Sequence, residues 1–160
     1  MFKLLSSILS LLIFSLNVSA QENGAFKVGV ILPLTGAVAE YGVATKKGIE
    51  LAKKEHPELF SKIQFIYEDS QYEGKIALSA FQKLKNTDGI SLAYVWGYGP
   101  SQAVIPVAEA DKFPVIAVSA ERSVSLNKKY TLRFCYYIEM ILYFTLFRQA
   151  AAWRPRINLS

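Results

Sequence analysis

The residues most able to do covalent chemistry are a single histidine and a single cysteine, His56 and Cys135. His56 precedes Pro57 at the expected end of a helix, a position that suits capping better than catalysis. Cys135 stands between Phe134 and Tyr136, and packing among aromatic side chains would disfavour the thiolate that a reactive cysteine needs. The chain offers no set of nucleophile, base and acid at useful spacing. We therefore expect that it is not an enzyme.

Two other patterns could hold a metal or a cofactor, and neither is complete. The acidic pair Glu68-Asp69 ends a strand, and no histidine or cysteine is spaced to complete a metal site with it. Gly97 and Gly99 have the spacing of a dinucleotide-binding loop, and Glu121 stands about where a ribose-binding carboxylate would be. The third glycine of that loop is missing, since Gln102 occupies its place. A plain tight turn fits better, and we expect no metal and no cofactor.

Small polar residues gather where the predicted strands end. These turns are Thr35-Gly36, Asp69-Ser70, Gly97 to Ser101 and Ser119 to Ser123. In an open parallel sheet, ligands bind beyond the carboxyl ends of the strands. Ser101 opens a predicted helix whose free N–H groups suit a carboxylate, and Tyr41 could cover an apolar part of a ligand. Each residue alone is ordinary turn chemistry; together they favour a binding site.

Strands and helices alternate along the segment that must position these turns. The predicted strands are 26–32, 63–67, 92–96 and 115–118, and the predicted helices are 43–55, 75–85 and 101–111. Helices of this length between strands form βαβ units, which build an open parallel sheet with helices on both faces. In the first helix, the spacing of Ala44, Gly48, Leu51 and Ala52 predicts one buried stripe.

The N-terminus has the order of a secretory signal peptide. A positive start at Lys3 is followed by a run over 4–16 that is apolar apart from scattered serines, and small residues at Val18 and Ala20 precede the expected cleavage before Gln21. The alternative, a membrane anchor, needs about 20 apolar residues, more than this run provides. We therefore expect residues 1–20 to be removed and the protein to be periplasmic.

The net charge of +5 does not indicate a nucleic-acid-binding protein. Between Gln21 and Glu139 there are 14 Lys/Arg and 13 Asp/Glu, so the body of the chain is nearly neutral. A nucleic-acid surface would cluster its basic groups on one face of the fold. No nucleic-acid partner is expected.

Residues 138–160 differ in character from the rest. Met140 to Phe147 is apolar apart from Thr145 and has no clear period, and 148–160 is basic, with no acidic residue. This composition predicts a divergent, frameshifted or truncated tail. The alternative is a natural short domain with its own closing segment.

The motifs over 26–137 resemble, in order and spacing, the periplasmic solute-binding proteins of branched-chain amino-acid (Leu/Ile/Val) ABC transporters. They are Lys27-Val28-Gly29-Val30-Ile31-Leu32-Pro33-Leu34-Thr35-Gly36 leading to Tyr41-Gly42, then Tyr67-Glu68-Asp69-Ser70, Gly97-Tyr98-Gly99-Pro100-Ser101, Val107-Ala108-Glu109, Phe113-Pro114-Val115-Ile116 and Ser119-Ala120. Members have two lobes with the type I periplasmic binding fold. The resemblance implies that 21–137 is the first lobe of this fold, which is then incomplete.

The resemblance also implies a site, a ligand and a partner. A small polar ligand such as an amino acid would be held by Gly99, Pro100 and Ser101 in one loop, by Ser119, Ala120 and Glu121 in another, and by Tyr41 against its side chain. The partner would be the membrane permease of an ABC transporter. Both loops depart from the hydroxyl-rich pattern of the family, which leaves another small polar ligand open. The alternative function is a single-lobe extracytoplasmic sensor or interaction module without a role in transport.

Overall fold

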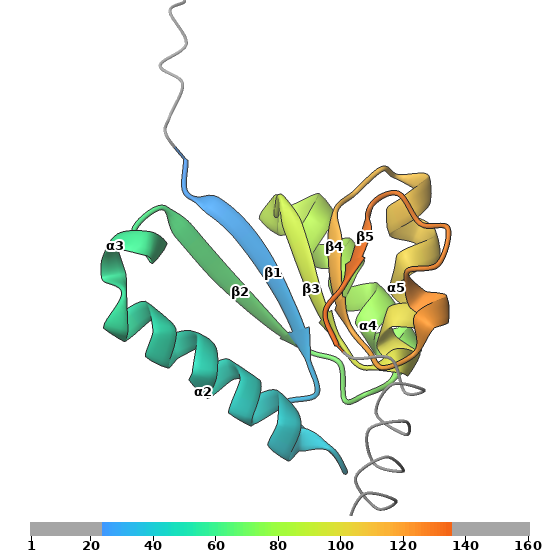
Figure 1. The fold of residues 1–160 in the computed structure, drawn as a ribbon, viewed down its shortest axis with the longest axis horizontal. Helices are drawn as coiled ribbons and strands as arrows, with labels where there is room; N and C mark the ends of the chain where they lie inside the picture. Colours follow the sequence, from blue (N-terminus) through green and yellow to red (C-terminus); the bar gives the residue numbers. More distant parts are fainter. Residues whose placement is uncertain (1–23, 136–160) are drawn as a thin grey trace, which may run out of the picture.

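The predicted alternation of strands and helices folds as one five-stranded parallel sheet in a computed structural model that describes residues 24–135 (Figure 1). The elements, in chain order, are β1 (Phe26–Leu32), α2 (Ala39–Glu55), α3 (Pro57–Phe60), β2 (Ile63–Asp69), α4 (Gly74–Lys83), the π-helical turn η1 (Leu84–Asp88), β3 (Leu92–Trp96), α5 (Tyr98–Ala110), β4 (Val115–Val118), the 3₁₀ turn η2 (Arg122–Val124) and β5 (Thr131–Arg133). The strand order is β2-β1-β3-β4-β5, and every pairing is parallel. The predicted signal peptide (1–20) and divergent tail (138–160) lie outside the described residues.

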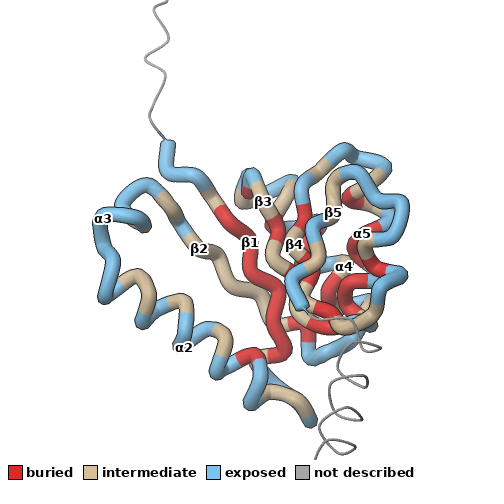
Figure 2. The backbone as a smooth tube through the Cα atoms, in the orientation of Figure 1, coloured by how far each residue is buried: buried red, intermediate tan, exposed pale blue. Residues whose placement is uncertain are grey.

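Helices cover both faces of the sheet, as the sequence predicts. Alternation along β1 sends Val28, Val30 and Leu32 toward the face that carries α2, while Ile31 points into the core beneath α4 and α5. The α4/α5 side holds most of the buried side chains, with Phe81 and Leu84 as the largest contributions from α4 and η1 (Figure 2). The main core therefore lies between the sheet and these two helices.

The predicted buried stripe of the first helix is wrong. Ala44 and Gly48 are exposed, and Leu51 is 54% exposed. The helix instead meets the body of the domain through Ile49, which packs half-buried against the side chains of β1, and at Gly42, where a Cβ would lie 2.0 Å from the carbonyl oxygen of Pro33. A helical period shows that one face is more apolar, but not that the face lies against a sheet. The close approach at Gly42 fixes where α2 begins to cross the sheet.

Helix α5 begins earlier than predicted, so the expected loop at Gly99 to Ser101 is the first turn of this helix. Gly97 is its N-cap, with φ 98° and ψ 156°, and the N–H of Ser101 donates the first helical hydrogen bond to the carbonyl of Gly97 (3.1 Å). Pro100 is tolerated at the third helical position because the first N–H groups of a helix need no intrahelical partner. The turn after β3 is correspondingly reduced to Gly97.

Three shorter features also differ from the prediction. Strand β2 continues to Asp69 instead of ending at Tyr67, and α3 and β5 were not predicted. Both unpredicted elements are three or four residues long, too short to show a period. Between residues 24 and 135, no helix has the length and apolar character needed to cross a membrane.

Candidate ligand-binding site

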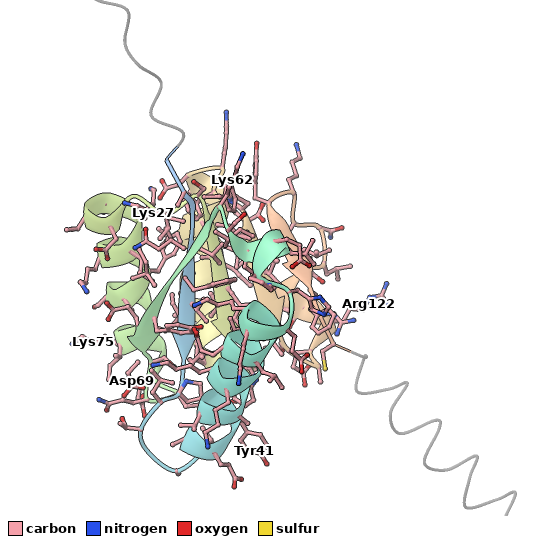
Figure 3. The ribbon with its side chains drawn as sticks, turned by 90° about the vertical axis from the view of Figure 1, so that its left-hand side faces the viewer. Lys27, Tyr41, Lys62, Asp69, Lys75 and Arg122 are labelled. Carbon is pink, nitrogen blue, oxygen red and sulfur yellow. The ribbon has the colours of Figure 1, made fainter. Side chains whose placement is uncertain are left out.

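The carboxyl ends of β1 and β3 lie side by side where the strand order reverses. β1 pairs with β2 on one side and with β3 on the other, so the connections leaving β1 and β3 run to opposite faces of the sheet. In open α/β sheets, such a reversal opens a crevice in which ligands bind. Figure 3 places Tyr41 and Asp69 toward this end of the molecule and Lys27 and Lys62 toward the other.

Asp69, the last residue of β2, ties together the loops that leave β1 and β2. Its Oδ1 accepts hydrogen bonds from the backbone N–H groups of Leu34 (2.8 Å), Thr35 (3.3 Å) and Gln71 (2.9 Å). Its Oδ2 accepts one from Thr35 Oγ1 (2.5 Å). Burial alone would raise the pKa of Asp69, but these hydrogen bonds outweigh it and hold the pKa below its usual value. Asp69 is thus a charged anchor for this edge of the sheet.

Three aromatic side chains from different elements meet above the strand ends. The ring of Tyr41 stacks on that of Trp96, with centroids 5.5 Å apart and planes 18° apart. Tyr72 meets Trp96 at 5.9 Å and 58°. Tyr72 has a φ of 65°, uncommon outside glycine, and its backbone N–H donates a hydrogen bond to Ser70 Oγ (3.3 Å). The loop therefore holds Tyr72 in a strained conformation that brings its ring to Trp96.

Gly97 makes room for the ring of Tyr72. A Cβ on Gly97 would lie 2.4 Å from Cε2 of Tyr72 and 3.0 Å from Cδ2. The backbone of Gly97 is also in a region that only glycine adopts readily. Glycine is thus required here on two independent grounds.

A hollow of about 310 Å³ opens between these rings and the end of β4. It is lined by Tyr72, Trp96, Gly97, Tyr98, Val118, Ser119, Ala120, Glu121 and Cys135. The turn after β4 is fixed from both sides: Ser119 Oγ accepts a hydrogen bond from the N–H of Glu121 (3.1 Å), and Arg133 Nη1 donates to the Ser119 carbonyl (2.9 Å). The hollow thus has an aromatic wall and a polar wall.

The structure unites only part of the predicted site. Ser119, Ala120 and Glu121 line the hollow, and Tyr41 adjoins it through its stack on Trp96. Gly99, Pro100 and Ser101 lie in the first turn of α5, outside the lining. Pro100 and Ser101 are fully buried, and within the described residues the Ser101 hydroxyl has no hydrogen-bond partner.

Four of the lining residues lie outside the turns predicted to bind: Tyr72, Trp96, Val118 and Cys135. Gly97 and Tyr98 lie within the predicted turn Gly97 to Ser101, although neither was assigned a contact with the ligand. Trp96 directly precedes the predicted turn Gly97 to Ser101, and Val118 directly precedes the turn at Ser119, so extending each turn by one residue would have included both. Tyr72 depends on a backbone conformation that no local pattern shows. Cys135 is exposed and Phe134 is 70% exposed, so the two do not pack together in the core as expected; Tyr136, the other predicted neighbour, lies outside the described residues.

The residues considered for catalysis or metal binding do not converge. His56 lies between α2 and α3, with Nδ1 3.7 Å from Glu58 Oε1. Over residues 24–135, no group of three or more His, Cys, Asp or Glu side chains is placed to hold a metal ion.

Comparison with known proteins yields a family and a set of solved structures. A family model described as "periplasmic binding protein" matches residues 25–152, and the match extends past Tyr137. No curated protein matches the sequence. A solute-binding protein of an ABC transporter from Rhodopseudomonas palustris, solved with 3,4-dihydroxybenzoic acid, is 25% identical with a TM-score of 0.67, over 72% of this chain and 33% of its own.

Two further structures have the same fold. A leucine-binding protein from Thermotoga maritima is 22% identical with a TM-score of 0.70, over 79% of this chain and 38% of its own. A branched-chain amino acid transporter substrate-binding protein from Streptococcus pneumoniae was solved with isoleucine. It is 20% identical with a TM-score of 0.63, over 71% of this chain and 34% of its own. The chain thus spans about a third of the length of the structures it matches.

Proposed function

The chain belongs to the periplasmic binding protein family, and on this basis we propose that it acts in solute binding for an ABC transporter. The ligand is a small polar molecule taken up at the carboxyl edge of the sheet. The observation that carries this proposal is the hollow between the aromatic cluster and the turn after β4. It lies at the edge of the sheet where open α/β folds bind ligands.

The two walls of the hollow suit the two parts of a small amphipathic solute. The rings of Tyr72 and Trp96 offer an apolar surface, which Tyr41 extends by stacking on Trp96. The turn of Ser119, Ala120 and Glu121 offers hydrogen-bonding groups. A concave site with a mostly apolar lining and a few fixed polar groups is typical of small-molecule sites.

The first turn of α5 takes part from beneath the hollow. Gly99, Pro100 and Ser101 are helical, so their contribution is the positive end of the helix dipole; Pro100 has no N–H, and the N–H of Ser101 is already bonded to the carbonyl of Gly97. Ser101 itself is too deeply buried for direct contact with a ligand in this conformation. We assign it to the support of the site.

Solved proteins with this fold indicate the range of ligands to be tested. Their descriptions name isoleucine, benzoate and 3,4-dihydroxybenzoic acid. The expected signal peptide over 1–20 supports a periplasmic location, and the membrane permease of the transporter is the corresponding partner.

The proposal is tested by filling the hollow. Ala120→Leu adds bulk to its lining, whereas Ala44→Leu makes the same change on an exposed position of α2. Isothermal titration of leucine, isoleucine, benzoate and 3,4-dihydroxybenzoate at millimolar concentrations should detect binding to the unaltered chain. Ala120→Leu should reduce that affinity at least tenfold and Ala44→Leu should leave it unchanged. Equal affinity in all three proteins would place the site elsewhere.

A further inference from the structure

A row of large aromatic and aliphatic side chains crosses one face of β3, β4 and β5. Tyr94 pairs with Ile116 and Ile116 pairs with Leu132, so the three side chains stand side by side on adjacent strands. Their neighbours along the strands, such as Val95 and Ala117, are fully buried beneath α4 and α5, so alternation sends the row to the opposite face. We call this the open face; it comprises Leu92, Tyr94, Ile116, Leu132 and Phe134.

The described helices leave much of the open face uncovered. On that side of the sheet, α2 packs over β1 through Ile49 and over β2 through Glu50, whose Oε1 accepts a hydrogen bond from the hydroxyl of Tyr67 (2.8 Å). In Figure 1, α2 runs beside β2 and β1, away from β4 and β5. Leu132 is 65% exposed and Phe134 is 70% exposed. A contiguous apolar surface of this kind indicates that another segment or molecule packs on it.

We propose that residues 138–152 of the same chain cover the open face, with Met140 to Phe147 as the buried part. Seven of the eight residues from Met140 to Phe147 are apolar. A segment that is apolar on every side is stable in water when it is buried on more than one side. The family match runs through residue 152 and therefore includes this segment. The packing is independent of which ligand binds in the hollow.

The chain leaves the sheet beside the surface that the segment is to cover. β5 is an edge strand and carries Leu132, and Cys135 follows the end of β5 by two residues. Five peptide steps join Cys135 to Met140, and an extended chain spans about 3.3 Å per step, or about 16 Å in all. Adjacent strands are about 4.8 Å apart, so β3 is about 10 Å from β5, and a packed layer stands about 10 Å from a sheet. The linker is therefore long enough for the segment to fold back over all three strands.

Two other occupants would bury the same side chains: a second copy of the chain, and the apolar run over 4–16. A tethered segment has an effective concentration of about millimolar for a surface that its linker reaches, which a second copy attains only in concentrated solution. The run over 4–16 is joined to the sheet through β1, two strands away from β4, and it is expected to be removed on export. The segment next to β5 is thus favoured over both.

Two leucines with equal exposure in the described structure give a matched pair for the test. Leu132 lies on the open face and is 65% exposed, and Leu59 lies in α3 and is 66% exposed. Hydrogen exchange of the full chain, followed by mass spectrometry, should show the amides of 140–147 protected at least about tenfold relative to an unstructured peptide. Leu132→Asp should abolish that protection and lower the urea midpoint by about 0.5 M, because a covered leucine cannot be replaced by a charge without loss. Leu59→Asp should change neither measurement.

A reciprocal variant tests whether the two surfaces meet. Leu142→Asp should lower the urea midpoint about as much as Leu132→Asp, and the double variant should lower it little further, because both changes break the same contact. If Leu132→Asp does not fold, Leu132→Ala replaces it, with an expected loss of protection of about threefold. Exchange of 140–147 at the unprotected rate in the unaltered chain, protection of 4–16 in its place, or fully additive effects in the double variant would each overturn the proposal. Sedimentation that shows a dimer dissociated by Leu132→Asp would assign the open face to a second copy and overturn it as well.

Discussion

Replacing Gly97 by alanine should disrupt the site and destabilise the domain at the same time. The residue is the N-cap of α5, and its backbone has φ 98° and ψ 156°. This region is essentially restricted to glycine, and a side chain there costs about 1–3 kcal/mol. The new Cβ would also lie 2.4 Å from Cε2 of Tyr72, so that ring must move away from Trp96.

The expected loss is at least about 2 kcal/mol in the free energy of unfolding, because the backbone strain remains even if the ring of Tyr72 rotates away. Gly48→Ala is the matched control. Gly48 lies within α2, and a Cβ there would meet nothing within 4 Å. Alanine is favoured over glycine in a helix by about 1 kcal/mol, so this variant should be slightly more stable than the unaltered chain.

Urea unfolding followed by circular dichroism measures both changes. With a slope of about 2 kcal/mol per molar urea, Gly97→Ala should lower the midpoint by about 1 M, and Gly48→Ala should raise it by a few tenths. The same change would thus have opposite effects at two positions. Equal stability of Gly97→Ala and the unaltered chain would refute both the backbone conformation at Gly97 and the contact with Tyr72.

Other predictions concern the anchor, its charge and export. Asp69→Ala removes four hydrogen bonds to a carboxylate and should lower the free energy of unfolding, measured in urea, by about 3 kcal/mol. Each hydrogen bond to a charged group contributes about 1.5–3 kcal/mol, and the solvent exposure of this group makes the total smaller than the sum of the four. Burial alone would raise the pKa of Asp69 and of Glu109, but the hydrogen bonds that each carboxylate accepts outweigh it, so both pKa values are lower in the folded protein. The stability that the two ionised carboxylates contribute is therefore present above their unfolded pKa values of about 4, and it is lost as the pH falls through their folded pKa values. Unfolding at pH 6, 4 and 3 should show this loss, and a stability that is constant or rises toward pH 3 would contradict it. Mass spectrometry of protein from the native host should find an N-terminus at Gln21; an intact Met1 would contradict export.

The sheet was predictable because its signals are local. β1, β3 and β4 are short apolar runs closed by Pro, Gly or Ser, and the structure shows each of them at the predicted residues. The start of α5 was harder to place, because Gly and Pro normally indicate a turn. Gly97 alone makes that turn, and the helix accommodates both Gly99 and Pro100 in its first positions.

The candidate site was predictable only where it follows the strand ends. Ser119 to Glu121 come directly after β4, and sheet geometry places them at the ligand edge. The aromatic cluster depends on contacts between distant elements: Tyr41 from α2, Tyr72 from the loop after β2 and Trp96 from β3. The positive φ of Tyr72 is stabilised by Ser70 and has no signature of its own in the sequence.

The central claim, that a small solute binds at the carboxyl edge of the sheet, is tested most directly through Cys135. This is the one cysteine of the sequence, it is exposed, and it lines the hollow. Its alkylation rate is measured with and without the ligand that binds most tightly in the titrations. A double variant, Cys135→Ser with Ser79→Cys, moves the thiol to an exposed position on α4 and serves as the control. Ligand should slow alkylation of Cys135 several-fold and leave the relocated thiol of the double variant unaffected; equal rates at Cys135 with and without bound ligand would contradict the account.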